Sequence, residues 1–255
     1  MKLYLGTAVW REETVAYGQS MRLLWRELDK QGIPFTDGTV AGDALISRSR
    51  SIIASSFLRS DADVLLSIDS DIWFRPQDAL KLAGQAEEYG IIAALYMTRN
   101  LNTQPALMLP DEPVLFHAGA TPVEAQYVST GFVAVHRRVF QTVKDALPLC
   151  HQQWTDNGVD TSFWPFYMPY VIEWPGDVNM YLSEDWAFCQ RAKDAGFKCW
   201  VDPSIRLGHM GQTMYTMEDL IRAPKPSARP LKLLRDKNGE LQAFTLDQVR
   251  EFQEA

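Results

Sequence analysis

Apolar positions in the first hundred residues follow two alternating periods. Short apolar runs predict buried strands, and apolar residues three or four apart predict helices. We expect strands over residues 2–5, 33–35, 64–68 and 91–96, helices over 13–31, 47–59 and 76–90, and a loop over 37–43. This alternation predicts an α/β protein whose mixed, mostly parallel central sheet is flanked by helices.

The pattern of apolar and polar residues changes in the middle of the chain. Between residues 106 and 136, short apolar runs are separated by proline and glycine, which predicts antiparallel or mixed pairing, with strands at 126–128 and 132–135. The aromatic stretch 154–174 is interrupted by prolines and cannot form a regular helix, so we expect a long, structured loop. Its rings could stack on the flat face of a ligand or pack as a lid over the sheet.

The last part of the chain begins with a helix signal. Ser183 precedes two acids, a typical helix start, and Gly196 is suited to end that helix before a strand at 197–201. Residues 212–255 are expected to be a small C-terminal extension. It should begin with a proline-rich linker at residues 223–230. We then expect a hairpin of strands 231–234 and 241–244, and a short polar helix from about Thr245.

Composition narrows the class of protein. The chain has 255 residues, of which 46% are hydrophobic and 22% charged, which suits one large globular domain or one domain with an appendage. A formal charge of −7 argues against extensive nucleic-acid binding. The three cysteines match no metal or redox motif, and no apolar run approaches 18 residues. We therefore expect a soluble cytoplasmic protein without a transmembrane segment.

The strongest chemical signal is Asp69-Ser70-Asp71, which directly follows the buried run 64–68. Ligands of open α/β sheets gather beyond the carboxyl ends of strands. Residues i and i+2 of an extended segment point the same way, so both carboxylates could approach one cation, and oxygen ligands suit Mg²⁺ or Mn²⁺. The alternative is that two acids only solvate the end of a strand, which is the commoner case for an isolated Asp-x-Asp.

These residues also resemble a known family. Arg48-Ser-Arg50 and residues 62–72, with their Asp-x-Asp, look like the nucleotide-sugar half of a GT-A fold glycosyltransferase of the family 2 type. Later stretches are similar to that family's acceptor-side turn, acidic helix start and terminal histidine: residues 129–132, 183–191, 195–197, 201–203 and 208–210. The resemblance covers about residues 1–211, with a nucleotide-sugar half over about 1–100 and an acceptor half over about 101–211.

The resemblance implies a metal site and a donor site. Asp71 and His209 would hold the metal, and Asp69 would contact the sugar or ribose directly or through the ion. A histidine beside carboxylate and phosphate oxygens favours Mn²⁺ over Mg²⁺. For His209 the alternative is an ordinary surface or capping histidine. Ser70, within the motif, would also lie against the donor.

The resemblance further implies a base and a phosphate contact. Asp185 would take the proton of an acceptor hydroxyl, with Glu184 supporting it or binding the acceptor; the helix dipole alone favours acids in a first turn. One of Arg48 and Arg50 would face the diphosphate, although both could simply solvate a helix. By position, Thr7 and Ala8, expected just after the first strand, would meet the nucleotide.

The expected activity is therefore metal-dependent transfer of a sugar from a nucleotide-diphosphate sugar to an unidentified acceptor hydroxyl, with inversion. One alternative is a GT-A-like module that binds a nucleotide sugar without turnover. Another is a phosphatase with Asp69 as nucleophile and Asp71 as acid, which is disfavoured because Trp73 stands where that motif has a small hydroxyl residue or valine. No glycine-rich dinucleotide or P-loop motif follows any expected strand.

Overall fold

The computed structural model describes residues 1–99, 104–109, 114, 116–151, 162–176 and 178–219, and the backbone of 231–235 and 241–245. The helices of this part are α1 (Val15–Gln31), α2 (Ile46–Arg59), α3 (Pro76–Tyr89), α4 (Arg137–Lys144) and α5 (Glu184–Asp194). Its first seven strands are β1 (Leu3–Val9), β2 (Phe35–Ala41), β3 (Val64–Ile68), β4 (Ile72–Trp73), β5 (Ile91–Ala94), β6 (Val123–Ala125) and β7 (Phe132–His136). The later strands are β8 (Tyr170–Trp174), β9 (Val178–Leu182), β10 (Cys199–Asp202), β11 (Gly208–Met210), β12 (Met214–Tyr215), β13 (Leu231–Arg235) and β14 (Leu241–Thr245).

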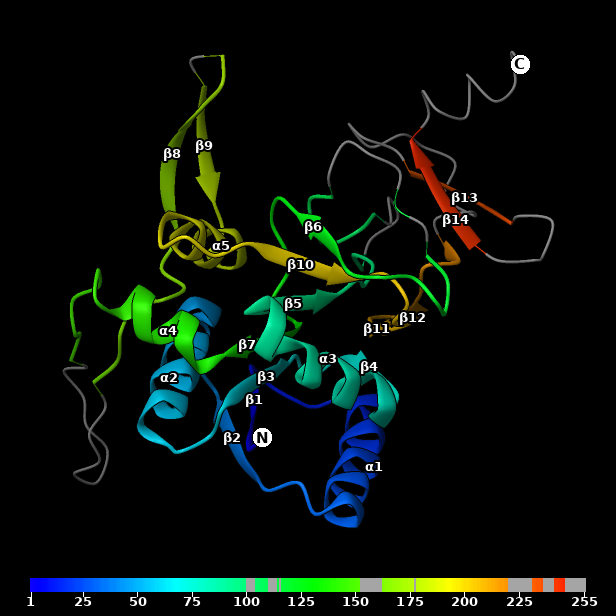
Figure 1. Ribbon diagram of the computed structural model, residues 1–255, viewed down its shortest axis with the longest axis horizontal. Coiled ribbons are helices and arrows are strands. Elements are labelled where there is room, and N and C mark those ends of the chain that lie inside the picture. The colour runs from blue at the N-terminus through cyan, green and yellow to red at the C-terminus, as the bar shows by residue number, and fades with distance from the viewer. Residues whose placement is uncertain are drawn as a thin grey trace.

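A seven-stranded sheet in the order β2-β1-β3-β7-β5-β10-β6 forms the centre of the molecule (Figure 1). β1 runs parallel to β2 and β3, and β5 runs parallel to β10. β7 lies antiparallel between β3 and β5, and β6 is antiparallel to β10. Five of these seven strands therefore point the same way, and the predicted α/β fold with a mostly parallel sheet is confirmed.

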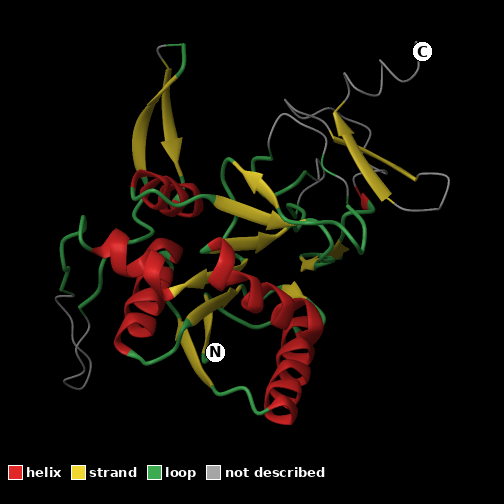
Figure 2. Cartoon of the chain, in the orientation of Figure 1, coloured by secondary structure: helices red, strands yellow, loops and turns green. Residues whose placement is uncertain are grey.

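Helices cover both faces of this sheet (Figure 2). Alternate residues of a strand point to opposite faces, so Leu3 and Leu5 pack beneath α1 and α3, whereas Tyr4 packs beneath α2. α4 and α5 lie on the same face as α2. The two apolar layers hold the ends of the central strands, and hence the acidic turn after β3, in fixed positions.

The edge strand β2 corrects one expectation. It covers residues 35–41, where a strand at 33–35 and a loop at 37–43 were expected, and it pairs with β1 along its whole length. An edge strand is only half covered, so it tolerates the polar residues and glycine that indicated a loop. At Gly38 any Cβ would clash with the ring of Tyr4.

The second half of the chain holds elements that the apolar pattern missed. α4 was not expected, the expected strand at 126–128 is instead β6 at Val123–Ala125, and part of the expected aromatic loop is the hairpin β8–β9, which extends from the body (Figure 1). The loop expectation over 154–161 lies outside the described residues. In the tail the hairpin β13–β14 is confirmed, and the helix expected from about Thr245 also lies outside them.

A small sheet of order β12-β11-β4 brings distant parts of the chain together. β4 begins immediately after Asp71, and its Ile72 pairs with His209 of β11. This pairing fixes the acidic turn against a segment more than a hundred residues away. None of the helices in the described part of the chain is long and apolar enough to cross a membrane.

Candidate functional site

The acidic turn between β3 and β4 is held by backbone hydrogen bonds. The N–H of Asp69 donates to the carbonyl of Gly131 at 2.8 Å, and the N–H of Ile72 donates to the carbonyl of Asp69 at 3.1 Å. The N–H of Met210 donates to the carbonyl of Asp71 at 2.8 Å. The turn therefore contacts the residue before β7 and the end of β11, and it presents its two carboxylates to different neighbours.

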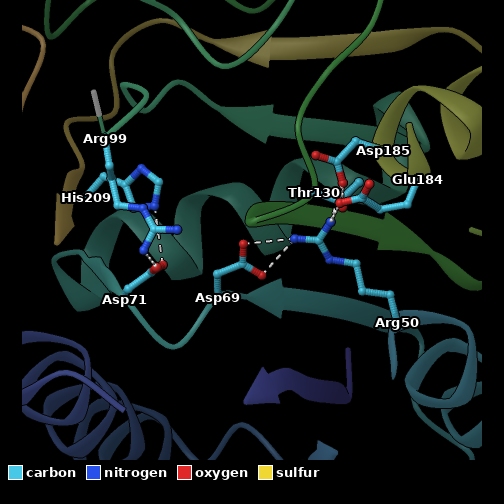
Figure 3. Close-up of polar contacts among 8 residues, drawn as sticks. All are labelled: Arg50, Asp69, Asp71, Arg99, Thr130, Glu184, Asp185 and His209. Carbon is cyan, nitrogen blue, oxygen red and sulfur yellow. Dashed lines mark hydrogen bonds and ion pairs between the residues drawn. The ribbon is translucent and has the colours of Figure 1, made fainter. Parts of the chain in front are cut away.

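Asp71 and His209 lie side by side (Figure 3). His209 Nε2 is 3.4 Å from Asp71 Oδ1, and His209 Nδ1 is 2.7 Å from the carbonyl oxygen of Met97. A carbonyl only accepts hydrogen bonds, so Nδ1 carries the proton in the neutral ring and the lone pair of Nε2 faces the carboxylate. This is how proteins orient a histidine that binds a metal.

The two residues fit a divalent cation that also takes ligands from a substrate. Among the described side chains, Asp71 Oδ1 is one of few buried polar atoms without a hydrogen-bond partner, which is the state expected of an oxygen suited to a cation. The described residues contain no cluster of three or more histidine, cysteine or acidic side chains arranged for a metal. A Mg²⁺ or Mn²⁺ ion held here would complete its coordination with phosphate oxygens and water.

Charge also favours the ionised form of Asp71. Burial raises the pKa of this carboxyl, but a protonated His209 and the guanidinium of Arg99 lower it by more, so the net pKa lies below its usual range. Arg99 forms an ion pair with Oδ2 of Asp71. The carboxylate is therefore ready to bind a cation at neutral pH.

A second cluster surrounds Arg50, which projects from α2 (Figure 3). Its NH2 group donates to both oxygens of Asp69, at 2.8 and 2.9 Å, and its NH1 group donates to Glu184 at 3.1 Å and to Asp185. The side chain is only 5% exposed. Burial lowers the pKa of Arg50, but the surrounding acids outweigh it and hold that pKa above its usual range. One buried guanidinium thus joins three carboxylates.

Asp185 lies at the start of α5 with its carboxylate fixed. Within the described residues, Thr130 and Arg50 both donate hydrogen bonds to Oδ1 of this carboxylate. These bonds leave Oδ2 available. Burial raises the pKa of Asp185 to about 6, with Arg50 and Thr130 opposing the shift and Glu184 adding to it. A carboxylate with these properties can accept a proton near neutral pH.

Tyr96 and the turn at Thr130 and Gly131 connect the two clusters. The ring of Tyr96 meets that of His209 edge-on, with centroids 5.0 Å apart. A Cβ at Gly131 would lie 2.6 Å from Asp69 Oδ2 and closer still to Tyr96 Oη, so only glycine allows this approach. Residues that follow β3 and β5, precede β7 and begin α5 therefore meet at one end of the central strands.

Several expected site residues lie elsewhere or make other contacts. Arg48 pairs with Asp43 through Nε at 2.6 Å and is not in the Arg50 cluster. One of Arg48 and Arg50 was expected to face a diphosphate; in the structure Arg50 binds carboxylates. Asp69, expected near the metal, has both oxygens on Arg50.

The expected nucleotide contacts also differ in their setting. Thr7 and Ala8 belong to β1, which continues to Val9, and do not follow it; the Thr7 hydroxyl is buried 2.7 Å from Tyr17 Oη. The Ser70 hydroxyl donates to the carbonyl of Glu12 at 3.3 Å, which ties the acidic turn to the loop after β1.

Two residues of the site were missed from sequence. Tyr96 and Arg99 follow β5, which parallels β3 in direction, and Arg99 reaches the carboxylate of Asp71. The rule that sites gather beyond the carboxyl ends of strands applied equally to β5. Neither residue is part of a recognisable motif, so position alone could have indicated them.

No protein-family model matches this chain, and no curated protein matches its sequence. Among solved structures, GalNAc-T7 with UDP, GalNAc and Mn²⁺ has a TM-score of 0.47 and 11% identity over 82% of this chain, which spans only 44% of that one. The catalytic domain of Drosophila β1,4-galactosyltransferase 7, in complex with xylobiose, has a TM-score of 0.43 and 11% identity, covering 96% and 94% of the two chains. Residues 1–349 of S. aureus TarS, with UDP-GlcNAc, have a TM-score of 0.45 and 9% identity, covering 80% and 57%. Each of these likenesses is at 11% identity or less, with a TM-score below 0.5.

Proposed function

We propose that this protein is a metal-dependent glycosyltransferase of the GT-A type. It would move a sugar from a nucleotide-diphosphate sugar to an acceptor hydroxyl, with inversion at the anomeric carbon. The observation that supports this most is that two different groups lie at the same end of the central strands. One is a buried oxygen of Asp71 beside His209, and the other is a separate carboxylate, Asp185, whose pKa is about 6.

In this proposal Asp71 and His209 hold Mn²⁺ or Mg²⁺. When bound, the cation offsets the negative charge that develops on the departing diphosphate. His209 contributes a fixed ring, since Met97 holds its Nδ1, and Tyr96 packs against its edge. A two-residue protein site leaves coordination positions for donor phosphates, which couples cation binding to donor binding.

Asp185 is the proposed base. It takes the proton of the acceptor hydroxyl as the hydroxyl oxygen forms a bond to the anomeric carbon and the bond from that carbon to the diphosphate breaks. Thr130 and Arg50 hold Oδ1, which leaves Oδ2 as the atom that would take the proton. Glu184, on the same guanidinium, supports this arrangement or binds the acceptor.

Asp69 has a different role from the one expected at a metal. Since Arg50 binds both of its oxygens, we assign Asp69 to a link between the donor turn and the base. The same bonds speak against Asp69 as the nucleophile of a phosphatase, because neither oxygen is free of the guanidinium. Thr7 and Ala8, near the end of β1, and Ser70, which hydrogen-bonds to the loop after β1, remain proposed donor contacts.

The proposed division of the chain follows from these roles. The donor turn belongs to about residues 1–100, the base and His209 belong to about 101–211, and residues 212–255 form an extension. Each half supplies one of the two cation ligands, so neither half could bind the cation in this way alone.

The decisive test is donor cleavage. The protein is incubated with MnCl₂ and a panel of nucleotide sugars, and release of nucleoside diphosphate is followed with and without EDTA. We expect slow release with one donor, abolished by EDTA and by Asp71→Asn, and reduced by Asp185→Asn when an acceptor is present. Donor binding without release would favour a silent binding module, and release of inorganic phosphate from phosphomonoesters would favour a phosphatase.

A further inference from the structure

Arg99 is the exposed member of the Asp71 cluster. Its side chain is 47% exposed, whereas that of Asp71 is 18% and that of His209 10% exposed. Its NH1 group contacts Asp71 Oδ2 and lies 3.4 Å from the carbonyl oxygen of Met210. The guanidinium therefore lies against the Asp71 and His209 pair (Figure 3) and is its most exposed member.

Arg99 differs from Arg50 in how firmly it is held. Arg50 is buried and binds three carboxylates, so it cannot leave without exposing their mutual repulsion. Within the part of the chain that the structure describes, Arg99 forms an ion pair with one carboxylate, at the edge of the cluster. A Cβ added to Gly211 would lie 3.4 Å from Cβ and Cδ of Arg99, so the stem rests on the backbone after β11 and only the charged end needs to move.

Electrostatic repulsion explains why the guanidinium of Arg99 must move when a cation binds. With Arg99 in place, the negative charge of Asp71 is balanced by one guanidinium. A divalent cation on Asp71 would meet that guanidinium at contact distance, where two positive groups repel. Together, the cation, Arg99 and Asp71 would leave two uncompensated positive charges, which a diphosphate neutralises.

We propose that Arg99 is a counter-ion of Asp71 that yields this carboxylate to the divalent cation and then binds a diphosphate oxygen of the donor. The proposal rests on the proposed function and adds to it a phosphate-binding residue. Arg99 thus weakens cation binding when no nucleotide is present and strengthens nucleotide binding when the cation is present.

The test is the variant Arg99→Gln, with Arg75→Gln as its matched control. Arg75 also forms an ion pair with an acid, Asp78, and is 54% exposed. Arg75→Gln therefore removes the same charge at a position outside the Asp71 cluster. Mn²⁺ affinity without nucleotide is measured from the electron paramagnetic resonance signal of free Mn²⁺. Binding of UDP and GDP at saturating Mn²⁺ is measured by calorimetry.

Opposite changes are expected in the two measurements. Arg99→Gln should bind Mn²⁺ several-fold more tightly than the wild type and bind the preferred nucleoside diphosphate about tenfold more weakly, since a charge-assisted hydrogen bond is lost. Arg75→Gln should match the wild type in both. Arg99→Lys, which keeps the charge but loses the fork of donors, should bind Mn²⁺ like the wild type and the nucleotide with intermediate affinity.

Other results separate this inference from the proposed function. If the wild type binds Mn²⁺ and a nucleotide, but Arg99→Gln changes neither or weakens both, the counter-ion role is wrong and the proposed function stands. If the wild type binds no Mn²⁺ even with a nucleoside diphosphate present, both are wrong. Circular dichroism of each variant checks that the fold is intact.

Discussion

Replacing Arg50 with methionine tests the network around the proposed base. Methionine keeps an unbranched apolar stem in α2 but removes the guanidinium that joins Asp69, Glu184 and Asp185. Three acids would then face one another at a largely buried point. The variant should lose both stability and the fixed position of the base.

The magnitude follows from burial. Removing one partner of a buried ion pair costs about 3–5 kcal/mol because the remaining charge has no compensation. The side chain of Arg50 is 5% exposed and its partners are 16–22% exposed, so this range applies. Total stabilities are about 5–15 kcal/mol, and the change should therefore remove about a fifth or more of the free energy of unfolding.

Urea unfolding at pH 7.5 measures this change, with Arg48→Met as the control in the same helix. Arg48 is 43% exposed and pairs with Asp43 at the surface, so its removal should cost about 0–1 kcal/mol. If Arg50→Met costs no more than Arg48→Met, the buried network does not hold this site together.

The pH dependence of the same variant gives an independent check. Burial raises the pKa of Asp185 to about 6, and Arg50 opposes that shift, so without Arg50 the folded protein takes up a proton at still higher pH. An acid whose folded pKa is raised above its unfolded value stabilises the fold as pH falls. The deficit of Arg50→Met should therefore shrink between pH 8 and pH 5.

Three further outcomes are expected. If Asp185 is the base, kcat/KM should rise with pH and level off above an apparent pKa near 6, so that at pH 5 it is roughly a tenth of the plateau; a flat profile from pH 5 to 8, with chemistry shown to limit the rate, would exclude it. Gly131→Ala should lower the free energy of unfolding by about 1–3 kcal/mol because its Cβ would clash with Tyr96 and Asp69, whereas Gly84→Ala, in a helix with open space around it, should raise it by about 0.5–1 kcal/mol; equal effects in urea unfolding would refute the tight turn. Donor cleavage should stop on addition of EDTA and return with excess MnCl₂, and cleavage that persists in EDTA would remove the metal from the mechanism.

The sequence predicted most of what local pattern controls. The buried run 64–68 and the acids after it gave both a central strand and the turn of the site, because a five-residue apolar run suits a strand covered on both faces. The helix start at Ser183 was likewise found, since two acids in a first turn match the helix dipole.

What the sequence could not give depends on contacts between distant segments. The strand predicted at 33–35 falls short of β2 because the polar residues of β2 are explained only by pairing with β1. The prolines around β8 and β9 indicated a loop and so concealed that hairpin. Arg50 looked like a phosphate ligand because its three carboxylate partners are 19, 134 and 135 residues away. Arg99 belongs to no motif, and only folding brings it to Asp71.

The most direct test of the central claim is the anomalous diffraction of manganese in crystals grown with MnCl₂ and a nucleoside diphosphate. The account predicts one strong peak at about 2.0–2.3 Å from both a carboxylate oxygen of Asp71 and Nε2 of His209, with diphosphate oxygens completing the coordination. A manganese ion bound elsewhere, or the two side chains turned apart with the nucleotide present, would contradict it.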